Sequence, residues 1–277
     1  MRVKVLGLGG AVVLAGVVAL GADLALSDPV EGYQSVPAPE GSPFDELISG
    51  YWFRADETRA MQDDEFENPG LLMVERGAEL WDVVDGAAGK SCASCHNDAT
   101  ETMKGVAAHF PKWNEKLGKP VNLEQQINLC RTGNMQAEAW KYDSEPLVAM
   151  TTFVRHQSMG MPVAVQIDGP MAPFFEKGQQ LYYERRGQLD MACASCHEAN
   201  TGKYLRSDHL SQGQTNGFPT YRLKWQGVGS LHKRFVGCMQ DVRAEPYKAG
   251  SDEFVNLELY TAWRGNGLPI ETPSVRQ

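Results

Sequence analysis

The 277-residue chain lacks the features of several protein classes. Its six cysteines are too few for a disulfide scaffold of this length. It has no excess of basic residues, because 26 Lys and Arg stand against 35 Asp and Glu, and the formal net charge of −9 argues against nucleic acid as a partner. The segments between its apolar stretches show no strand alternation. These absences favour a helical protein with an acidic surface.

The chain also lacks an apolar run long enough to cross a membrane. The apolar run at residues 6–20 is shorter than the roughly 20 residues that a transmembrane helix needs. Arg2 and Lys4 precede this stretch, and small residues permit cleavage after Gly21 or Ser27. We therefore expect a signal peptide at residues 1–27 and an exported mature protein with no membrane span.

Four of the six cysteines lie in two identical pentapeptides, CASCH at 92–96 and CASCH at 193–197. In a CxxCH motif both thiols add to the vinyl groups of haem, and the adjacent imidazole binds the iron. A thioredoxin-type dithiol would need a βαβ context, and a zinc site would have to pair cysteines across the two motifs. The motifs predict two covalently attached haem c groups, with thiols and iron ligands at Cys92, Cys95, His96, Cys193, Cys196 and His197.

The two motifs belong to an internal repeat. A shift of 101 residues superposes them and also superposes Arg76-Gly77 on Lys177-Gly178. A later match joins 137–141 to 244–248, and each copy then has a Ser followed by acids, at Ser144 and Ser251, which predicts a helix N-cap. The repeat predicts a mostly α fold of two tandem class-I-like cytochrome c domains with large loops. We expect an irregular N-terminal arm at 28–70, a first domain at 71–165 and a second at 166–277.

Apolar spacing of three and four residues predicts the helices of each copy. Residues 71–84 and 172–186 have this spacing near the start of each copy. Near the end of each copy a further helix is predicted, whose apolar face is formed in the first copy by Leu147, Met150 and Val154. In the second copy the corresponding face is formed by Phe254, Val255, Leu257, Leu259 and Thr261.

Each copy keeps one further cysteine at an equivalent place, Cys130 and Cys238. These two residues are candidate thiolate ligands to iron opposite His96 and His197. The alternatives are a disulfide between them, two buried thiols, or distal ligation by His109 and His209. We interpret the remaining histidines, His156 and His232, as surface or capping residues.

The second copy is the more basic of the two. Between the CxxCH histidine and the further cysteine, the first copy has four basic and four acidic residues, whereas the second has six basic and two acidic. Arg234 precedes Cys238 by four residues, which is one helical turn. A guanidinium there would bind a small oxyanion and favour the nucleophilic thiolate. The second copy is therefore the predicted place of chemistry.

The residues around Cys238 resemble the SoxA family, the dihaem subunit of the SoxAX cytochrome of bacterial thiosulfate oxidation. The resemblance spans nearly the whole mature chain. Its most specific stretches are YRLKWQGVGSLH at 221–232, RFVGC at 234–238, RAEP at 243–246 and YTAWRG at 260–265. It implies a periplasmic L-cysteine S-thiosulfotransferase that pairs with the monohaem cytochrome SoxX. Such an enzyme joins thiosulfate oxidatively to a cysteine of the carrier SoxY, within SoxYZ, and passes electrons to a soluble cytochrome c.

The resemblance also implies roles for individual residues. Cys238 would carry a persulfide as catalytic intermediate and distal ligand, Arg234 would bind the substrate, and Lys224 would support it. The axial pairs would be His96 with Cys130 and His197 with Cys238. The alternatives are a plain electron-transfer dihaem cytochrome without bond-forming chemistry, and a dihaem peroxidase with an open distal position.

Overall fold

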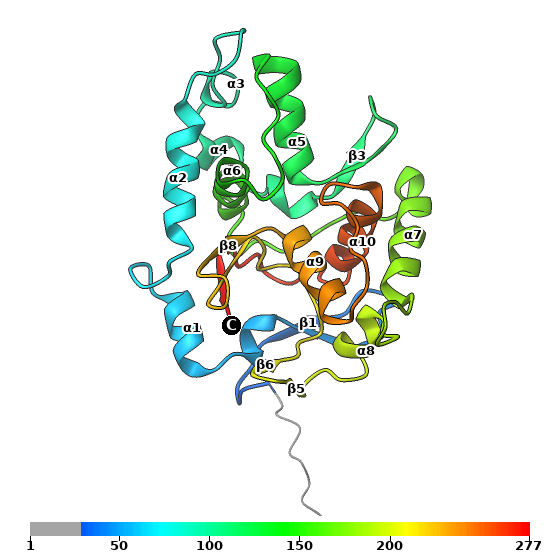
Figure 1. The fold of residues 1–277 in the computed structure, drawn as a ribbon. Helices are drawn as coiled ribbons and strands as arrows, with labels where there is room; N and C mark the ends of the chain where they lie inside the picture. Colours follow the sequence, from blue (N-terminus) through cyan, green and yellow to red (C-terminus); the bar gives the residue numbers. More distant parts are fainter. Residues whose placement is uncertain (1–28) are drawn as a thin grey trace, which may run out of the picture.

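The computed structural model describes residues 29–277, so the predicted signal peptide at 1–27 lies outside the described residues. Figure 1 shows a mainly helical molecule in which the first copy lies above the second, with the N-terminal arm passing beneath and beside them. Within residues 29–277, no helix combines the length and the apolar character that a membrane crossing requires.

The helices follow the repeat. After α1 (Asp56–Asp63) in the arm, the first copy begins with α2 (Leu71–Asp82), and the second copy begins with α7 (Ala172–Tyr183). The predicted helices at 71–84 and 172–186 are thus confirmed, each slightly shorter than expected. The other helices of the first copy are α3 (Ala93–His96), α4 (Ala99–Thr102), α5 (Leu123–Cys130) and α6 (Glu145–His156). Those of the second copy are α8 (Cys193–His197), α9 (Leu231–Asp241) and α10 (Asp252–Trp263). Short 3-10 or π turns lie at Gly50–Phe53, Val106–His109, Arg131–Met135 and Gly169–Met171.

In each copy the first helix packs closely against the last, α2 on α6 and α7 on α10. A glycine permits the close approach. A Cβ on Gly77 would lie 2.4 Å from the Ala149 carbonyl oxygen, and one on Gly178 would lie 1.9 Å from that of Asn256. These glycines are the pair superposed by the 101-residue shift, so the duplication preserves the helix crossing as well as the CxxCH motif.

The predicted apolar faces are buried. Leu147, Met150 and Val154 of α6 are at most 4 % exposed, and Phe254 and Leu257 of α10 are at most 1 % exposed. This burial supplies most of the free energy that holds the helices, which are too short to be stable alone.

The two predicted N-caps differ. Ser251 accepts a hydrogen bond from the Phe254 amide, as expected. Ser144 occupies the N-cap position of α6, but its hydroxyl donates instead to the Lys141 carbonyl at 2.6 Å.

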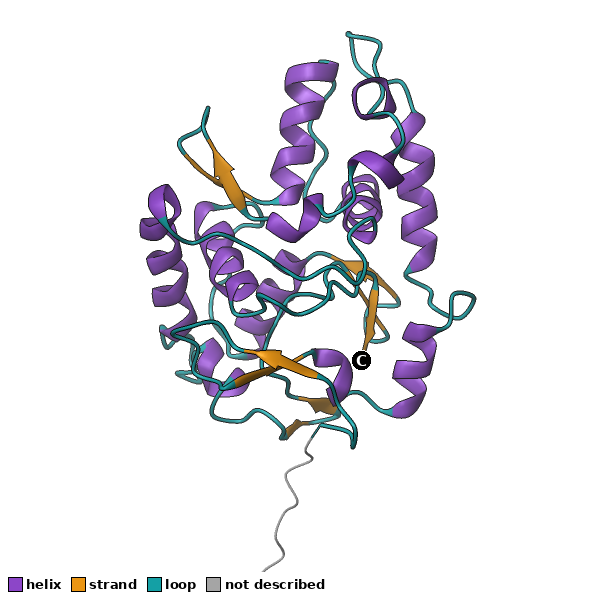
Figure 2. Ribbon diagram, turned by 180° about the vertical axis from the view of Figure 1, so that it is seen from behind, coloured by secondary structure: helices purple, strands orange, loops and turns teal. Residues whose placement is uncertain are grey.

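Short strands connect the helices, and Figure 2 shows how little of the molecule they form. Three antiparallel hairpins pair β1 (Ser35–Pro37) with β2 (Glu46–Ile48), β3 (Lys112–Asn114) with β4 (Lys119–Val121), and β5 (Tyr204–Leu205) with β6 (Asp208–His209). A three-stranded sheet has β7 (Thr220–Arg222) at its centre, antiparallel to β8 (Gly227–Gly229) and parallel to β9 (Ser274–Arg276). The C-terminal tail is thereby fixed to the strand that leads toward α9.

The N-terminal arm packs on the second copy. It contains one hairpin and α1, so it is less irregular than predicted, and α1 contacts β9. The Ile48 amide donates to Gln212 Oε1, and the Arg54 guanidinium donates to the His209 carbonyl. The arm therefore helps to hold the loop between α8 and β7 in place.

Two apolar cores form, one around α2 and α6 and the other around α7 and α10. Val163 and Val165, at the end of the first copy, are buried in the second core. The Val163 amide donates to the Leu268 carbonyl at 2.9 Å, and the Val163 carbonyl accepts from Gly267 at 2.8 Å. We propose 71–165 and 166–277 as the limits of the two domains, which are the first and second copies of the repeat.

Candidate active site

The second CASCH motif forms the short helix α8, and its histidine is held in one orientation. His197 Nδ1 lies 2.8 Å from the Ser211 carbonyl oxygen, which leaves Nε2 available for a metal. Gly213 lies directly against the ring, since a Cβ there would be 2.7 Å from His197 Cγ. Burial lowers the pKa of His197 to about 4, so the imidazole is neutral, as metal ligation requires.

Each further cysteine lies beside the CxxCH motif of its own copy. Burial raises the pKa of Cys193 to about 12, and the neighbouring Cys238 contributes to this shift. Burial likewise raises the pKa of Cys92 to about 11, with a smaller contribution from Cys130. The six cysteines form no disulfide with one another, so the alternative of a Cys130–Cys238 disulfide is wrong. Among residues 29–277, no group of three or more His, Cys, Asp or Glu side chains is placed to hold a metal ion.

The remaining histidines differ in their surroundings. Both ring nitrogens of His209 lie 3.0 Å from backbone carbonyl oxygens, of Phe53 and Gly202, so this ring does not offer a nitrogen to iron. His109 is exposed, and its Nδ1 lies 3.0 Å from the Ala164 carbonyl. His156 is partly buried, with Nδ1 2.9 Å from the Thr272 carbonyl. The interpretation of His232 as a surface or capping residue is wrong: it is 1 % exposed and pairs with Glu258 of α10 in the same copy.

The position four residues before each further cysteine distinguishes the copies. In the first copy Gln126 occupies it, and its Nε2 donates to Cys130 Sγ at 3.5 Å. In the second copy Arg234 occupies it, on the same helix as Cys238, as predicted. Burial raises the pKa of Cys196, and the nearby Arg234 charge opposes that rise. A neutral amide in one copy thus corresponds to a guanidinium beside the thiols of the other.

Arg222 is a second cation at this site, and the sequence pattern did not single it out from the other basic residues of the second copy. It is 5 % exposed at the end of β7. Burial lowers the pKa of its guanidinium, the Arg234 charge lowers it further, and the Asp208 and Cys238 charges oppose this. The alternation of buried Thr220, half-exposed Tyr221 and buried Arg222 directs this side chain inward.

Lys224 lies apart from this arrangement. It is exposed in the turn between β7 and β8, and among the described residues it makes no hydrogen bond or ion pair that fixes it near Cys238. Arg222, which is buried near Cys238, is therefore better placed than Lys224 to support a bound anion.

Further buried arginines surround Arg222. Burial lowers the pKa of Arg54 to about 10, and the nearby Arg276 and Arg222 charges contribute to this, opposed by Asp208. Asp208 accepts from Arg222 Nη2 at 3.3 Å. Excess positive charge with low solvent access favours binding of a small anion.

The surroundings of both motifs fit an apolar prosthetic group held by thioether bonds. Partly buried apolar side chains line the edge of each core next to the motif; they are Ala93, Met103, Val106, Ile127 and Leu129 in the first copy, and Ala194, Phe235, Val236, Ala244 and Tyr247 in the second. Half-exposed apolar side chains beside thiols and an oriented imidazole are the expected lining of a covalently bound haem.

Comparison with known proteins agrees with this geometry. The family model described as "SoxA/TsdA, cytochrome c domain" matches residues 76–163 and 177–270. The L-cysteine S-thiosulfotransferase subunit SoxA of Pseudaminobacter salicylatoxidans is 57% identical over 241 residues, covering 87% of this chain and 84% of that protein. The subunit of the same name from Paracoccus pantotrophus is 48% identical over 252 residues, covering 90% and 87%.

Similarity extends to a solved structure. A chain of the crystal structure of SoxXA from P. pantotrophus superposes with a TM-score of 0.86 at 45% sequence identity, covering 90% of this chain and all of that one. The family match includes both CxxCH motifs and Cys238. The chain belongs to the SoxA/TsdA family of haem c proteins and is a SoxA-type cytochrome c with two tandem cytochrome c domains.

Proposed function

We propose that this chain is the dihaem subunit of a periplasmic L-cysteine S-thiosulfotransferase, exported by a signal peptide at residues 1–27. It pairs with a SoxX monohaem cytochrome and joins thiosulfate to a cysteine of a SoxY carrier within SoxYZ. The names of the relatives and the SoxXA complex in the structural match support this proposal. Electrons leave to a soluble cytochrome c.

The two haems would be held by each copy's own residues. The thioether cysteines are Cys92 and Cys95 in the first copy, and Cys193 and Cys196 in the second. The proposed axial pairs are His96 with Cys130 and His197 with Cys238. When bound, the haems supply the one-electron acceptors that a two-electron sulfur coupling requires.

Arg234 and Arg222 would bind the anion at Cys238, with Lys224 in a lesser role. Two guanidinium groups next to one sulfur suit thiosulfate, which carries two negative charges on adjacent oxygen and sulfur atoms.

Cys238 would act as the covalent intermediate. Its sulfur, as a persulfide, holds the thiosulfate-derived group until the carrier cysteine attacks, which divides the coupling into two steps. Overall, a carrier thiolate and thiosulfate form a cysteine S-thiosulfonate and release two electrons. The single observation that carries this function is the pair of guanidinium groups near the thiols of the second copy, Arg234 near Cys196 and Arg222 near Cys238. In the first copy the neutral Gln126 replaces Arg234, and the nearby Arg131 is paired with Asp85.

Replacement of Cys238 tests the proposal. The Cys238→Ser variant of the complex is expected to retain haem absorption bands and lose at least about 99 % of thiosulfate-dependent turnover with SoxYZ, on the order of the losses seen when a covalent nucleophile is removed. Cys130→Ser in the first copy is the matched control and should keep most of the activity. Full turnover by Cys238→Ser would show that Cys238 is not the covalent intermediate.

A further inference from the structure

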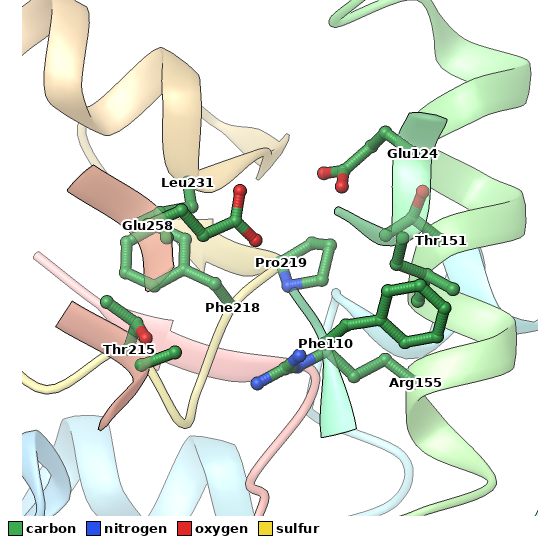
Figure 3. Close-up of a pocket in the computed structure, with 11 residues that line it drawn as sticks. Phe110, Glu124, Thr151, Arg155, Thr215, Phe218, Pro219, Leu231 and Glu258 are labelled. Atoms are coloured by element: carbon green, nitrogen blue, oxygen red, sulfur yellow. The ribbon is translucent and has the colours of Figure 1, made fainter. Parts of the chain in front are cut away.

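A polar cavity lies where the two copies meet. Its volume is about 20 Å³, enough for one water molecule. The first copy contributes Glu124, Thr151 and Arg155 to its lining, and the second contributes Thr215 and Glu258. Figure 3 shows the carboxyl groups of Glu124 and Glu258 directed toward one another across this space.

The cavity is built from equivalent positions of the repeat. The shift of 108 residues that superposes Cys130 on Cys238 also superposes Phe110 on Phe218, Leu123 on Leu231 and Glu124 on His232. The first two of these pairs line the cavity, and His232 contacts its Glu258. The site therefore lies on the contact between equivalent elements of the copies, α5 and α9.

Glu258 has two polar neighbours that fix its carboxyl group. Asn122 Nδ2 donates to its Oε2 at 2.9 Å, and His232 Nε2 lies 3.0 Å from the same oxygen. His232 Nδ1 accepts from the Gly250 amide at 3.0 Å, so the proton of a neutral imidazole is on Nε2, beside Glu258. Tyr142 stacks on the imidazole at 5.5 Å and holds the ring in place.

Glu124 accepts no side-chain hydrogen bond within the described part of the chain, and its carboxyl group has only its own backbone amide as donor. It is 8 % exposed, and beside it the buried hydroxyl of Thr151 and Nε of Arg155 have no hydrogen-bond partner among the described residues. Burial and the charge of Glu258 raise the pKa of Glu124 to about 7, while His232 and Arg155 oppose the rise. Two carboxyl groups that face each other across a small cavity share a proton more readily than they ionise together. The charged and titratable groups that face the pair are Arg155 on α6, His232 on α9, and Tyr142 and Asp143 in the loop before α6.

Each copy places one side chain of this cluster six residues before its further cysteine. Glu124 precedes Cys130 by six residues on α5, and His232, which contacts Glu258, precedes Cys238 by six on α9. At 1.5 Å per residue each separation is about 9 Å along the helix axis. Over such a distance in a protein interior, a change of one unit charge alters the proton affinity of a carboxyl group.

We propose that Glu124 and Glu258 form a proton-binding site that takes up one proton when an electron enters the haem-bearing interior and releases it when that electron leaves. This inference rests on the haem attachment of the proposed function. The electron comes from the coupling of thiosulfate to the carrier thiolate and departs to the acceptor cytochrome c. The proton comes from solvent and returns to it, so charge in the interior is balanced at both steps.

The test is redox titration of the purified complex followed by visible and infrared spectroscopy, without thiosulfate. As the complex is reduced near pH 7, a protonated-carboxyl C=O band should grow, and it should shift in D₂O. The midpoint potential of at least one haem should fall as the pH rises through neutrality. In Glu124→Gln the carboxyl band and most of this pH dependence should be lost, whereas Glu115→Gln, in the exposed β3–β4 turn, should match the parent.

Three outcomes would contradict the inference, and they can be told apart. If the unaltered complex shows haem bands but its protonated-carboxyl band does not change on reduction, the proton site alone is overturned. A midpoint potential that depends on pH in Glu124→Gln as it does in the parent would also overturn the proton site. If Glu124→Gln does not fold, the same measurements on Glu258→Gln and the infrared result on the parent test the inference instead. A complex without haem bands would overturn the proposed function and this inference with it.

Discussion

At the scale of single residues, the two copies diverge in the side chains around equivalent cysteines. Gln126 donates a neutral amide hydrogen bond to Cys130, and Arg234 takes its place one turn before Cys238. Spacing along the helix predicted Arg234, because four residues return the chain to the same face. Arg222 was not singled out, because its approach to Cys238 depends on the direction of a three-residue strand that local sequence does not define.

Conversion of Arg234 to the residue of the first copy should selectively weaken use of the anion. For Arg234→Gln we expect kcat/KM for thiosulfate to fall about tenfold to a hundredfold, since a hydrogen bond to a charged group contributes roughly 1.5–3 kcal/mol. Arg222→Gln should behave similarly, and Lys224→Gln should change it by less than about threefold. Steady-state kinetics with the exposed Lys116→Gln as control measures this. Equal losses in Lys224→Gln and Arg222→Gln would refute the assignment of Arg222.

An ion pair beside the first thiol site should make stability depend on acid pH. Arg131 Nη2 donates to Asp85 at 2.7 Å, and this bond, with one from the Gly86 amide, lowers the pKa of Asp85 below its usual value. A carboxyl whose pKa is lowered in the folded state stabilises above its unfolded pKa of about 3.9 and loses that contribution as pH falls. Asp85→Asn should lower Tm at pH 7, and its difference from the parent should shrink as the pH falls below about 3.9 and through the lowered folded pKa. A difference that stays constant over that range would exclude this ion pair as the cause.

At the scale of elements, the helices were predictable and the sheet was not. Apolar spacing located α2, α6, α7 and α10 because each is 12 residues long, enough for the helical period to be visible in the sequence. The strands of the β7 sheet have three residues each, too few for alternation to be visible. Its parallel partner β9 also lies more than 50 residues further along the chain, and no local turn predicts that pairing.

The glycine crossings should tolerate no side chain. Gly178→Ala would place a methyl group 1.9 Å from the Asn256 carbonyl oxygen, so α7 and α10 must separate. Overpacking of this kind typically costs about 1–3 kcal/mol, and Gly77→Ala should cost a similar amount. Gly133→Ala, where a Cβ meets nothing within 4 Å, is the control and should leave the free energy of unfolding unchanged or slightly higher. Denaturation midpoints equal to the parent's for both crossing variants would show that the crossings are looser than described.

At the scale of the whole molecule, helix α1 of the N-terminal arm and the C-terminal tail meet on the second copy. The Val275 amide donates to Gln62 of α1 at 3.0 Å, and Val275 is fully buried. Arg276 pairs with Glu271 at 3.0 Å and lies opposite Arg222 in the β7–β9 register. The duplication was evident from the sequence. The contact between the arm and the tail was not, because it depends on long-range contacts of single side chains.

Removal of the tail should therefore affect both stability and the site. Deletion of residues 274–277 removes β9, so Tm should fall by several degrees, with each kcal/mol lowering it by roughly 2–4 °C for a protein of this size. The KM for thiosulfate should rise as well, because β7 then holds Arg222 less firmly. Removal of Gln277 alone is the control. An unchanged KM for thiosulfate in the truncated protein would show that the C-terminal tail does not affect the site.

The proposed chemistry depends most directly on the sulfur of Cys238 being the distal ligand to iron in the second copy. Electron paramagnetic resonance of the oxidised complex measures this, because thiolate and imidazole or thioether ligands give different low-spin signals. In Cys238→Ser, we expect one thiolate-type signal to disappear while the other, from the Cys130 site, persists. A Cys238→Ser spectrum identical to that of the parent would contradict this ligation.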